Sequence, residues 1–212
     1  MINEKVKSPI VPKNIEAIYP LSPMQQGMLF HSLYAPESGV YVTQMTLTLK
    51  GDVNVSIFKS AWQKVVDRHS IFRTLFSWEN SPNPLQVVLK HVNLPWTNLN
   101  WLSSSLVEQQ YQLSELLETQ REQGFQLDRA PLMECLLIQI TGDTYKFIWT
   151  HHHILLDGWC LPIIFKEVLS LYKAEIHGET CHLPTPVTYR DYIVWLNAQD
   201  RAASTEFWRQ AL

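Results

Sequence analysis

The chain has 212 residues, 46% of them hydrophobic, and a formal net charge of −3 at pH 7. This length allows one large domain or two small ones, and either can bury a core without a disulfide or a metal. The acidic balance argues against a general nucleic-acid binder, which usually carries a basic stripe. No apolar run is long enough to span a membrane, and the polar N-terminus lacks the apolar core of a signal peptide. Cys135, Cys160 and Cys181 lack metal-type spacing, so we expect reduced thiols and a cytoplasmic protein.

The first regular element that the sequence predicts is a helix after Ser22. Residues 1–17 contain prolines and lysines without an apolar period, and we expect them to form an extended lead-in. Ser22 suits the N-cap position, Pro23 suits the first helical position, and Gln25 stands at the capping-box position. The helix should end before Pro36, because proline disfavours helical backbone in the residue before it.

The next segments alternate between strand and helix patterns. Apolar and polar residues alternate over 41–50, which is typical of a half-buried strand. A helix is predicted from about 56 to 69, because its apolar residues share one side. Segments 72–78 and 84–91 are expected to pair as a hairpin, and a helix with a long polar face is predicted over 103–123.

Two apolar strands, 132–140 and 144–152, are predicted next, joined by a Thr-Gly-Asp turn. Helices are then expected at about 160–176, 188–198 and 204–212. Strands with interspersed helices and short hairpins predict an α/β (α+β) fold. We expect a two-layer sandwich with a mainly antiparallel or mixed sheet and covering helices.

The stretch HHHILLDGW, residues 151–159, concentrates titratable groups at the end of the last predicted strand. Because side chains alternate along a strand, His151 and His153 should face one way and His152 the other. Three adjacent histidines on an extended backbone cannot converge on one tetrahedral zinc ion, so no metal site is predicted. Two interpretations remain from the residues alone: a hydrogen-bonded structural cluster at a sheet edge, and an active site.

Five segments resemble, in order, the motifs of nonribosomal peptide synthetase condensation domains. His152 to Gly158 resembles the HHxxxDG signature of that family. The other four segments are YPLSPMQQGMLFHSL (19–33), DRHSIFRTLF (67–76), FQLDRAPLMECLLIQI (125–140) and TYRDYIVWL (188–196). Phe72 stands where the RHxxLRTxF motif has leucine, and Ile193 where YxDYAxW has alanine. The resemblance implies that residues 18–212 form the N-terminal, chloramphenicol acetyltransferase-like lobe of such a domain, with the second lobe absent from this chain.

The resemblance also implies a reaction. In that family a donor acyl or peptidyl thioester and an acceptor aminoacyl thioester arrive on separate peptidyl carrier proteins, each tethered by phosphopantetheine. An amide bond is formed, and the lobe binds no cofactor directly. The motif implies that His153 is the catalytic residue, either as a general base or as a group that positions the amine and stabilises developing charge. The active site lies between two lobes, so we expect the lobe alone to be inactive.

Four residues are the implied supports of His153. His152 is expected to shape the turn, and Gly158 to allow close approach at the tunnel. The superfamily pattern points Asp157 away from the substrate, toward a salt bridge with Arg68. A fifth residue, Arg73, is expected to be a secondary structural support.

Other functions remain open. A free-standing trimeric CoA-dependent acyltransferase would carry its histidine close to the C-terminus, whereas 54 residues follow Gly158 here. An epimerisation domain shares the signature, but Trp159 and the block LSPMQQGMLF resemble condensing members better, and specifically those that accept a D-residue donor. A non-catalytic carrier-docking domain is the third alternative.

The partners expected are donor and acceptor carrier proteins and the second lobe, with no nucleic acid and no membrane. Residues 1–17 also have the place and length of a segment that docks an upstream synthetase subunit. Trp195, Phe207 and Trp208 are expected to be core residues or contacts between lobes.

Overall fold

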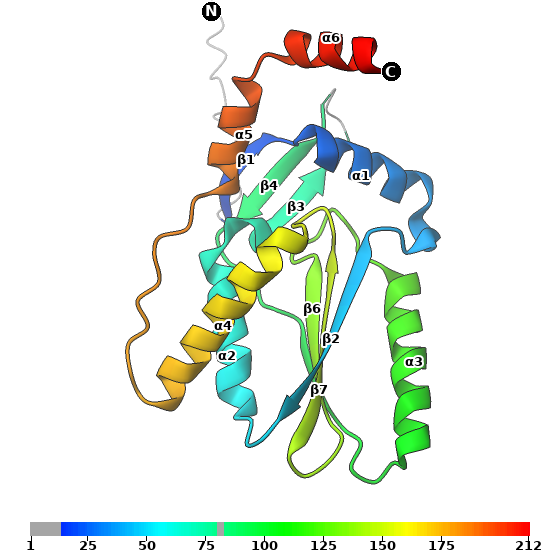
Figure 1. Ribbon diagram of the computed structural model, residues 1–212, viewed down its shortest axis with the longest axis vertical. Helices are drawn as coiled ribbons and strands as arrows, with labels where there is room; N and C mark the ends of the chain where they lie inside the picture. The colour runs from blue at the N-terminus through cyan, green and yellow to red at the C-terminus, as the bar shows by residue number, and fades with distance from the viewer. Residues whose placement is uncertain (1–13, 80–82) are drawn as a thin grey trace, which may run out of the picture.

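The computed structural model describes residues 14–79 and 83–212, which form two sheets and six α-helices (Figure 1). The small sheet is antiparallel, in the order β1 (Ile15–Pro20), β4 (Leu85–Leu89), β3 (Thr74–Ser77). The large sheet has the order β2 (Val42–Lys50), β7 (Thr144–His152), β6 (Met133–Gln139), β5 (Trp96–Asn100). Only β5 runs parallel to its neighbour in this sheet, so the predicted mixed α/β fold with a mainly antiparallel sheet is confirmed.

Helices cover both faces of the large sheet. The helices α2 (Val55–Arg68) and α4 (Leu161–Ile176) pack on one face, and α3 (Leu106–Gln123) lies on the other (Figure 1). The central strands are apolar on both faces: Leu136 and Ile148 pack toward α3, whereas Trp149 packs toward α2. Sheet strands that are buried on both faces need a helix layer on each. The large sheet is therefore the middle of three layers, one more than the sequence predicted.

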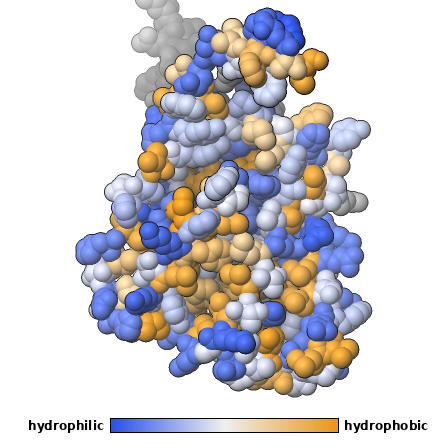
Figure 2. All heavy atoms as spheres, in the orientation of Figure 1, coloured by the Kyte–Doolittle hydropathy of each residue, from blue (hydrophilic) through white to orange (hydrophobic). Residues whose placement is uncertain are grey.

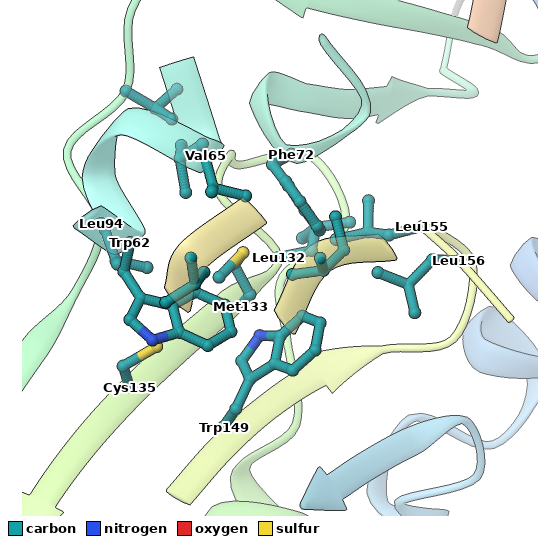
Figure 3. Close-up of a cluster of buried hydrophobic side chains, with 14 of the residues drawn as sticks. Trp62, Val65, Phe72, Leu94, Leu132, Met133, Cys135, Trp149, Leu155 and Leu156 are labelled. Carbon is teal, nitrogen blue, oxygen red and sulfur yellow. The ribbon is translucent and has the colours of Figure 1, made fainter. Parts of the chain in front are cut away.

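The main core lies between the large sheet, α2 and α4, and it includes the loop after β7 (Figure 3). Trp62 from α2 and Trp149 from β7 form its centre, with ring centroids 4.9 Å apart. Leu155 and Leu156 from the loop extend into the same cluster. The loop that carries the histidine motif is therefore held by core packing.

The helix α1 (Pro23–Tyr34) begins as predicted. The backbone N–H of Gln25 donates to Ser22 Oγ at 3.2 Å, and the N–H of Ser22 donates to Gln25 Oε1 at 3.0 Å. This reciprocal capping box satisfies two backbone donors that the first turn would otherwise leave free. A short 3-10 helix, η1 (Pro36–Ser38), follows α1.

Two helices follow the long connector after α4. The helix α5 (Tyr189–Asn197) packs on the small sheet through Ile193, which contacts a cluster containing Tyr19 and Val88. The last helix, α6 (Arg201–Ala211), projects at the top of Figure 1.

The structure corrects several sequence-based boundaries. The strands β1 and β5 were not predicted, and β1 shows that regular structure begins at Ile15 rather than after residue 17. Residues 70–73 form a 3-10 helix, η2 (Ser70–Arg73), so the predicted strand begins only at Thr74. Most of the lead-in considered as a docking segment, residues 1–13, lies outside the described residues.

The surface carries several apolar side chains, and Figure 2 shows them interspersed with polar ones on the face in view. Trp195, Phe207 and Trp208 are 57%, 62% and 58% exposed, so the prediction that they are core residues is wrong. Contact with another lobe remains the expectation for them. Within the described ranges, every helix is too short or too polar to cross a bilayer.

Candidate active site

The histidine motif lies where β7 ends. The strand stops at His152, and the chain then turns through residues 153–157 into a one-turn 3-10 helix, η3 (Gly158–Cys160), which leads directly into α4. His153 thus lies beyond the strand, and strand alternation does not extend to it. The expectation that His151 and His153 share a face by alternation therefore does not apply.

His153 is half-buried, and its backbone and ring are both held by main-chain carbonyls. Its N–H donates to the carbonyl of Tyr41 at 2.7 Å. Its ring Nδ1 lies 2.6 Å from the carbonyl oxygen of Leu156. A carbonyl oxygen can only accept, so Nδ1 must carry a proton in this contact. In the neutral ring Nε2 is then unprotonated, and its lone pair can accept a proton or a hydrogen bond from a substrate.

The residue that accepts the His153 N–H has an unusual backbone. Tyr41 has a φ of 68°, in the left-handed region that side-chain-bearing residues seldom adopt. It lies immediately before β2, and its ring centroid is 6.0 Å from that of His152. Backbone strain of this kind persists only where the surroundings impose it. Tyr41 therefore forms a fixed support beside the motif.

His152 is buried, and both of its ring nitrogens have partners. The N–H of Ile154 donates to Nδ1 at 3.1 Å, and Ser32 Oγ lies 3.1 Å from Nε2. Burial, reinforced by the neighbouring charge of His153, lowers the pKa of His152 to about 4. His152 is therefore neutral near pH 7 and has no free lone pair for a substrate or a metal.

His151 lies in the core, 1% exposed, with its ring centroid 4.5 Å from that of Trp149. Burial is the main cause that lowers its pKa to about 4, and the charges of His153 and His152 act in the same direction. Among the described residues, none forms a hydrogen bond with its Nδ1. His151 is therefore a neutral packing residue.

The described part of the chain does not bring three or more His, Cys, Asp or Glu side chains together as metal ligands.

The loop between His153 and Asp157 is fixed by apolar anchors and by hydrogen bonds. Ile154, Leu155 and Leu156 are 3%, 4% and 8% exposed. The carbonyl of Ile154 accepts from Gln25 Nε2 at 3.4 Å, and the N–H of Leu155 donates to the carbonyl of His152 at 3.2 Å. The three variable residues of the motif therefore anchor the loop that carries His153.

The predicted salt bridge between Asp157 and Arg68 is not formed. Asp157 is exposed, and its Oδ1 accepts from the N–H of Trp159 at 3.0 Å and from the thiol of Cys160 at 3.4 Å. It is thus the N-cap of η3. Gly158 has open space around the position of a Cβ and a φ outside the left-handed region. Among residues 14–79 and 83–212, nothing makes the close approach that was expected at Gly158.

Arg68 pairs instead with Glu167 of α4. Its Nε lies 3.1 Å from Glu167 Oε2, and the guanidinium also donates to the carbonyl of Pro184. His69 Nε2 lies 2.7 Å from the same carboxylate oxygen. Glu167, 9% exposed, therefore joins the end of α2 to α4 and, through Arg68, to the connector after α4. Glu167 was not singled out from the sequence, although an acidic residue placed between the apolar residues Ile164 and Val168 of the helix was a usable signal.

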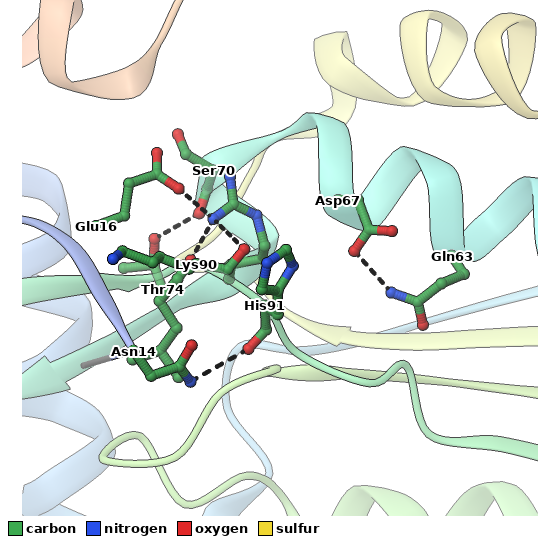
Figure 4. A network of polar contacts seen from close by, with 10 residues as sticks. Asn14, Glu16, Gln63, Asp67, Ser70, Thr74, Lys90 and His91 are labelled. Carbon is green, nitrogen blue, oxygen red and sulfur yellow. Dashed lines mark hydrogen bonds and ion pairs between the residues drawn. The ribbon is translucent and has the colours of Figure 1, made fainter. Parts of the chain in front are cut away.

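Arg73 is buried at the end of η2, where polar groups of the small sheet meet (Figure 4). Its Nη1 donates to Glu16 at 2.6 Å, to the carbonyl of Lys90 at 3.2 Å and to the carbonyl of Leu89. These contacts join η2 to β1 and to the end of β4. The side chain points into this network, in a structural position.

A crevice of about 360 Å³ adjoins the motif on the side of His152. It lies between the end of α1, the start of β2 and the segment before β6. Its wall includes Ser32, Val42, Trp78, Phe125 and His152, but not His153.

Comparison with known proteins shows to which family the chain belongs. The model of the Condensation domain family matches residues 15–212. One of the proteins of the linear gramicidin synthase of Brevibacillus parabrevis is 43% identical over 196 residues, which are 92% of this chain and 4% of that protein. Bacitracin synthase 1 of Bacillus licheniformis is 37% identical over 209 residues, 99% of this chain and 4% of that protein.

Solved structures show the same fold. The starter condensation domain of the rhizomide synthetase RzmA superposes with a TM-score of 0.75 at 19% identity, covering 84% of this chain and 44% of that one. The first condensation domain of the calcium-dependent antibiotic synthetase gives a TM-score of 0.71 at 16% identity, covering 81% and 42%. The chain thus spans less than half of either solved chain. The matched family, the extent of the match and the order of the motifs agree: the chain belongs to the condensation domain family.

Proposed function

We propose that this lobe supplies the catalytic histidine of a domain that joins two carrier-bound substrates by an amide bond. The observation that carries the proposal is the contact between His153 Nδ1 and the carbonyl of Leu156, which leaves Nε2 unprotonated at the surface of the motif. An amine nucleophile needs such an acceptor when its proton is lost. Family membership supports the same reaction.

The chemistry proceeds by addition and elimination. The neutral amine nitrogen of the acceptor attacks the thioester carbon of the donor, so a C–N bond forms and negative charge develops on the oxygen. His153 Nε2 accepts the proton that the nitrogen must lose. The C–S bond then breaks, and the proton passes to the thiolate that leaves. Leu156 stabilises the imidazolium formed in between, because its carbonyl holds the Nδ1–H throughout.

An α-amine has an ordinary pKa of about 8, so part of it is already neutral at pH 7. Proton transfer can therefore follow the attack, and orientation of the amine by Nε2 contributes from the start. On this proposal His153 positions the nucleophile first and takes its proton afterwards.

The substrates would arrive as thioesters on the phosphopantetheine arms of a donor and an acceptor carrier protein. A second lobe would close the other side of the active site, and the donor would carry a D-residue at its end. An upstream synthetase subunit is a further proposed partner, through residues 1–17. The coverage of less than half of the solved condensation domain supports the need for a second lobe.

The test is amide formation by the complete two-lobed protein that contains this chain, with donor and acceptor carriers loaded in advance. His153→Ala should lower the rate of product release by about 10²–10⁴-fold, the range of general acid–base catalysis. His177→Ala, an exposed histidine at the end of α4, is the matched control and should leave the rate unchanged. A normal rate for His153→Ala would refute the proposal. Inversion of the donor residue without amide formation would favour an epimerisation domain.

A further inference from the structure

A chain of hydrogen bonds links α1 to the histidine loop. Ser32, in the last turn of α1, donates its hydroxyl proton to the carbonyl of Met28 at 2.8 Å. Its oxygen lies 3.1 Å from His152 Nε2. On the opposite side of the same ring, Nδ1 accepts the N–H of Ile154 at 3.1 Å. Ile154 directly follows His153.

Two independent contacts fix the same tautomer of His152. The N–H of Ile154 can only donate, so Nδ1 must offer a lone pair. The single proton of the Ser32 hydroxyl is used on Met28, so Oγ must accept from His152, and Nε2 must carry the proton. A neutral ring with its proton on Nε2 fits both hydrogen bonds, the one with Ser32 and the one with Ile154. The other tautomer fits neither of these two contacts as they stand.

We infer that Ser32 is a positioning residue for His153, acting through the ring of His152. The inference rests on the proposed function of His153. Ser32 holds the His152 ring in the one tautomer and orientation that caps the Ile154 N–H. The His152 carbonyl also accepts the N–H of Leu155, so one residue fixes two successive peptide groups after His153.

Removal of the Ser32 hydroxyl should loosen this turn without unfolding the lobe. The His152 ring is buried, and its Nε2–H would lose its partner. A buried donor without a partner is unfavourable, so the ring should rotate or change tautomer, and the Ile154 N–H would lose its acceptor in turn. The apolar anchors of the loop and the Gln25 contact remain, so the fold should survive.

The experiment compares three variants of the complete two-lobed protein. Ser32→Ala removes the hydroxyl. Ser32→Thr keeps it and adds a methyl group to a side chain that lines the crevice of about 360 Å³. Ser170→Ala is the matched control, because Ser170 donates to the carbonyl of Lys166 at 2.8 Å in the same helical geometry but lies on α4, away from the motif. The readouts are kcat, KM and the ring ¹⁵N signals of selectively labelled histidine.

Ser32→Ala should lower kcat by about ten- to a hundredfold with KM unchanged, because small misplacements of a catalytic group have effects of this size. The ¹⁵N signals of His152 should lose the pattern of a ring protonated only on Nε2. Ser32→Thr and Ser170→Ala should keep both the rate and the pattern. An unchanged His152 pattern and an unchanged kcat in Ser32→Ala would overturn the inference, as would equal losses in Ser32→Ala and Ser170→Ala. If His153→Ala is fully active while Ser32→Ala still alters the His152 signals, the proposed function fails and only the structural coupling survives.

Discussion

His151, His152 and His153 are adjacent in sequence, but each ring has a different environment. His151 packs on Trp149 in the core, and His152 bridges α1 to the turn. His153 is half-buried, and its Nδ1 contacts the carbonyl of Leu156, which leaves Nε2 as the ring nitrogen that can accept a proton. The His152 ring caps the peptide group after His153, and on the proposed function the chemistry belongs to His153.

The two buried rings make stability depend on pH. The pKa of each is lowered from 6.5 to about 4, so between these values the native state binds fewer protons than the unfolded state. Stability is then fully present above about pH 6.5 and is lost as the pH falls toward 4. Each ring contributes at most about 3 kcal/mol to this loss, at 1.36 kcal/mol for each pKa unit. The free energy of unfolding in urea, compared between wild type and His151→Leu from pH 4 to 7, measures this loss. The variant should show a shallower dependence of stability on pH. An identical dependence in both proteins would contradict the lowered pKa of His151.

Asp157 and Glu167 should differ in their effect on stability. Glu167→Leu leaves Arg68 and His69 without their carboxylate and should lower the free energy of unfolding by about 3 kcal/mol, as expected when one partner of a buried pair is removed. Asp157→Asn should cost less than about 1 kcal/mol, because asparagine caps a helix as well as aspartate does. Denaturant titrations of both variants give the comparison. A larger loss of stability for Asp157→Asn than for Glu167→Leu would contradict this account and support the predicted salt bridge between Asp157 and Arg68.

At the scale of residues, the sequence predicted where the motif lies in the fold better than it predicted the contacts of its side chains. The spacing of the motif located His153, His152 and Asp157 at a strand end. It could not show that the Asp157 side chain turns back onto its own η3 backbone, because that depends on the local turn geometry. The partner of Arg68 lies 99 residues away in sequence, and only the packing of α2 against α4 brings the two together.

At the scale of elements, α1 connects the small sheet to the loop that carries the histidine motif. Gln25 and Gln86 exchange hydrogen bonds of 3.3 and 3.0 Å between α1 and β4, and Gln25 also contacts the carbonyl of Ile154. Both side chains are buried, at 2% and 0% exposure. Buried amides that satisfy one another specify a single arrangement of the elements that carry them.

A double-mutant cycle tests this link. Gln25→Leu and Gln86→Leu should each cost about 1–3 kcal/mol, because each leaves the other buried amide with a lost partner. The double variant should cost less than the sum, with a coupling energy of about 1 kcal/mol or more. Gln26→Leu, on the exposed side of α1, is the control and should change stability by less than about 0.5 kcal/mol. Additive losses at Gln25 and Gln86 would show that α1 and β4 are held independently.

The elements with a clear period were predictable, and those without one were not. The capping box of α1, the hairpin of β6 and β7 and the amphipathic face of α2 all follow from local pattern, and all are confirmed. The strands β1 and β5 are short segments that include proline or asparagine residues, which disfavour strands locally. They form because β4 and β6, already paired with β3 and β7 on one side, each offer a second edge for pairing. Only the tertiary structure supplies these edges.

At the scale of the whole molecule, the described lobe leaves aromatic side chains exposed on α5 and α6. Tyr192 and Trp195 stack with ring centroids 5.8 Å apart, and Phe207 and Trp208 are both more than half exposed.

On the proposed function, we expect the 212-residue chain alone to form no amide above the uncatalysed background, because a second lobe would supply the opposite wall of the site. The same loaded carriers should react with the complete two-lobed protein. Circular dichroism of the isolated chain is the control for folding. If the folded chain alone matches the rate of the complete protein, a second lobe is not needed for the reaction.

The central claim is that His153 presents an unprotonated Nε2 because Leu156 holds the proton on Nδ1. The most direct test is the ring ¹⁵N spectrum of His153 in the complete protein, recorded under conditions in which the spectrum itself shows a neutral ring and assigned by its loss in His153→Ala. We predict that Nδ1 carries the proton and that Nε2 shows the signal of a bare ring nitrogen. A proton found on Nε2 with Nδ1 bare would contradict the account, because the catalytic lone pair would then face Leu156 instead of the substrate.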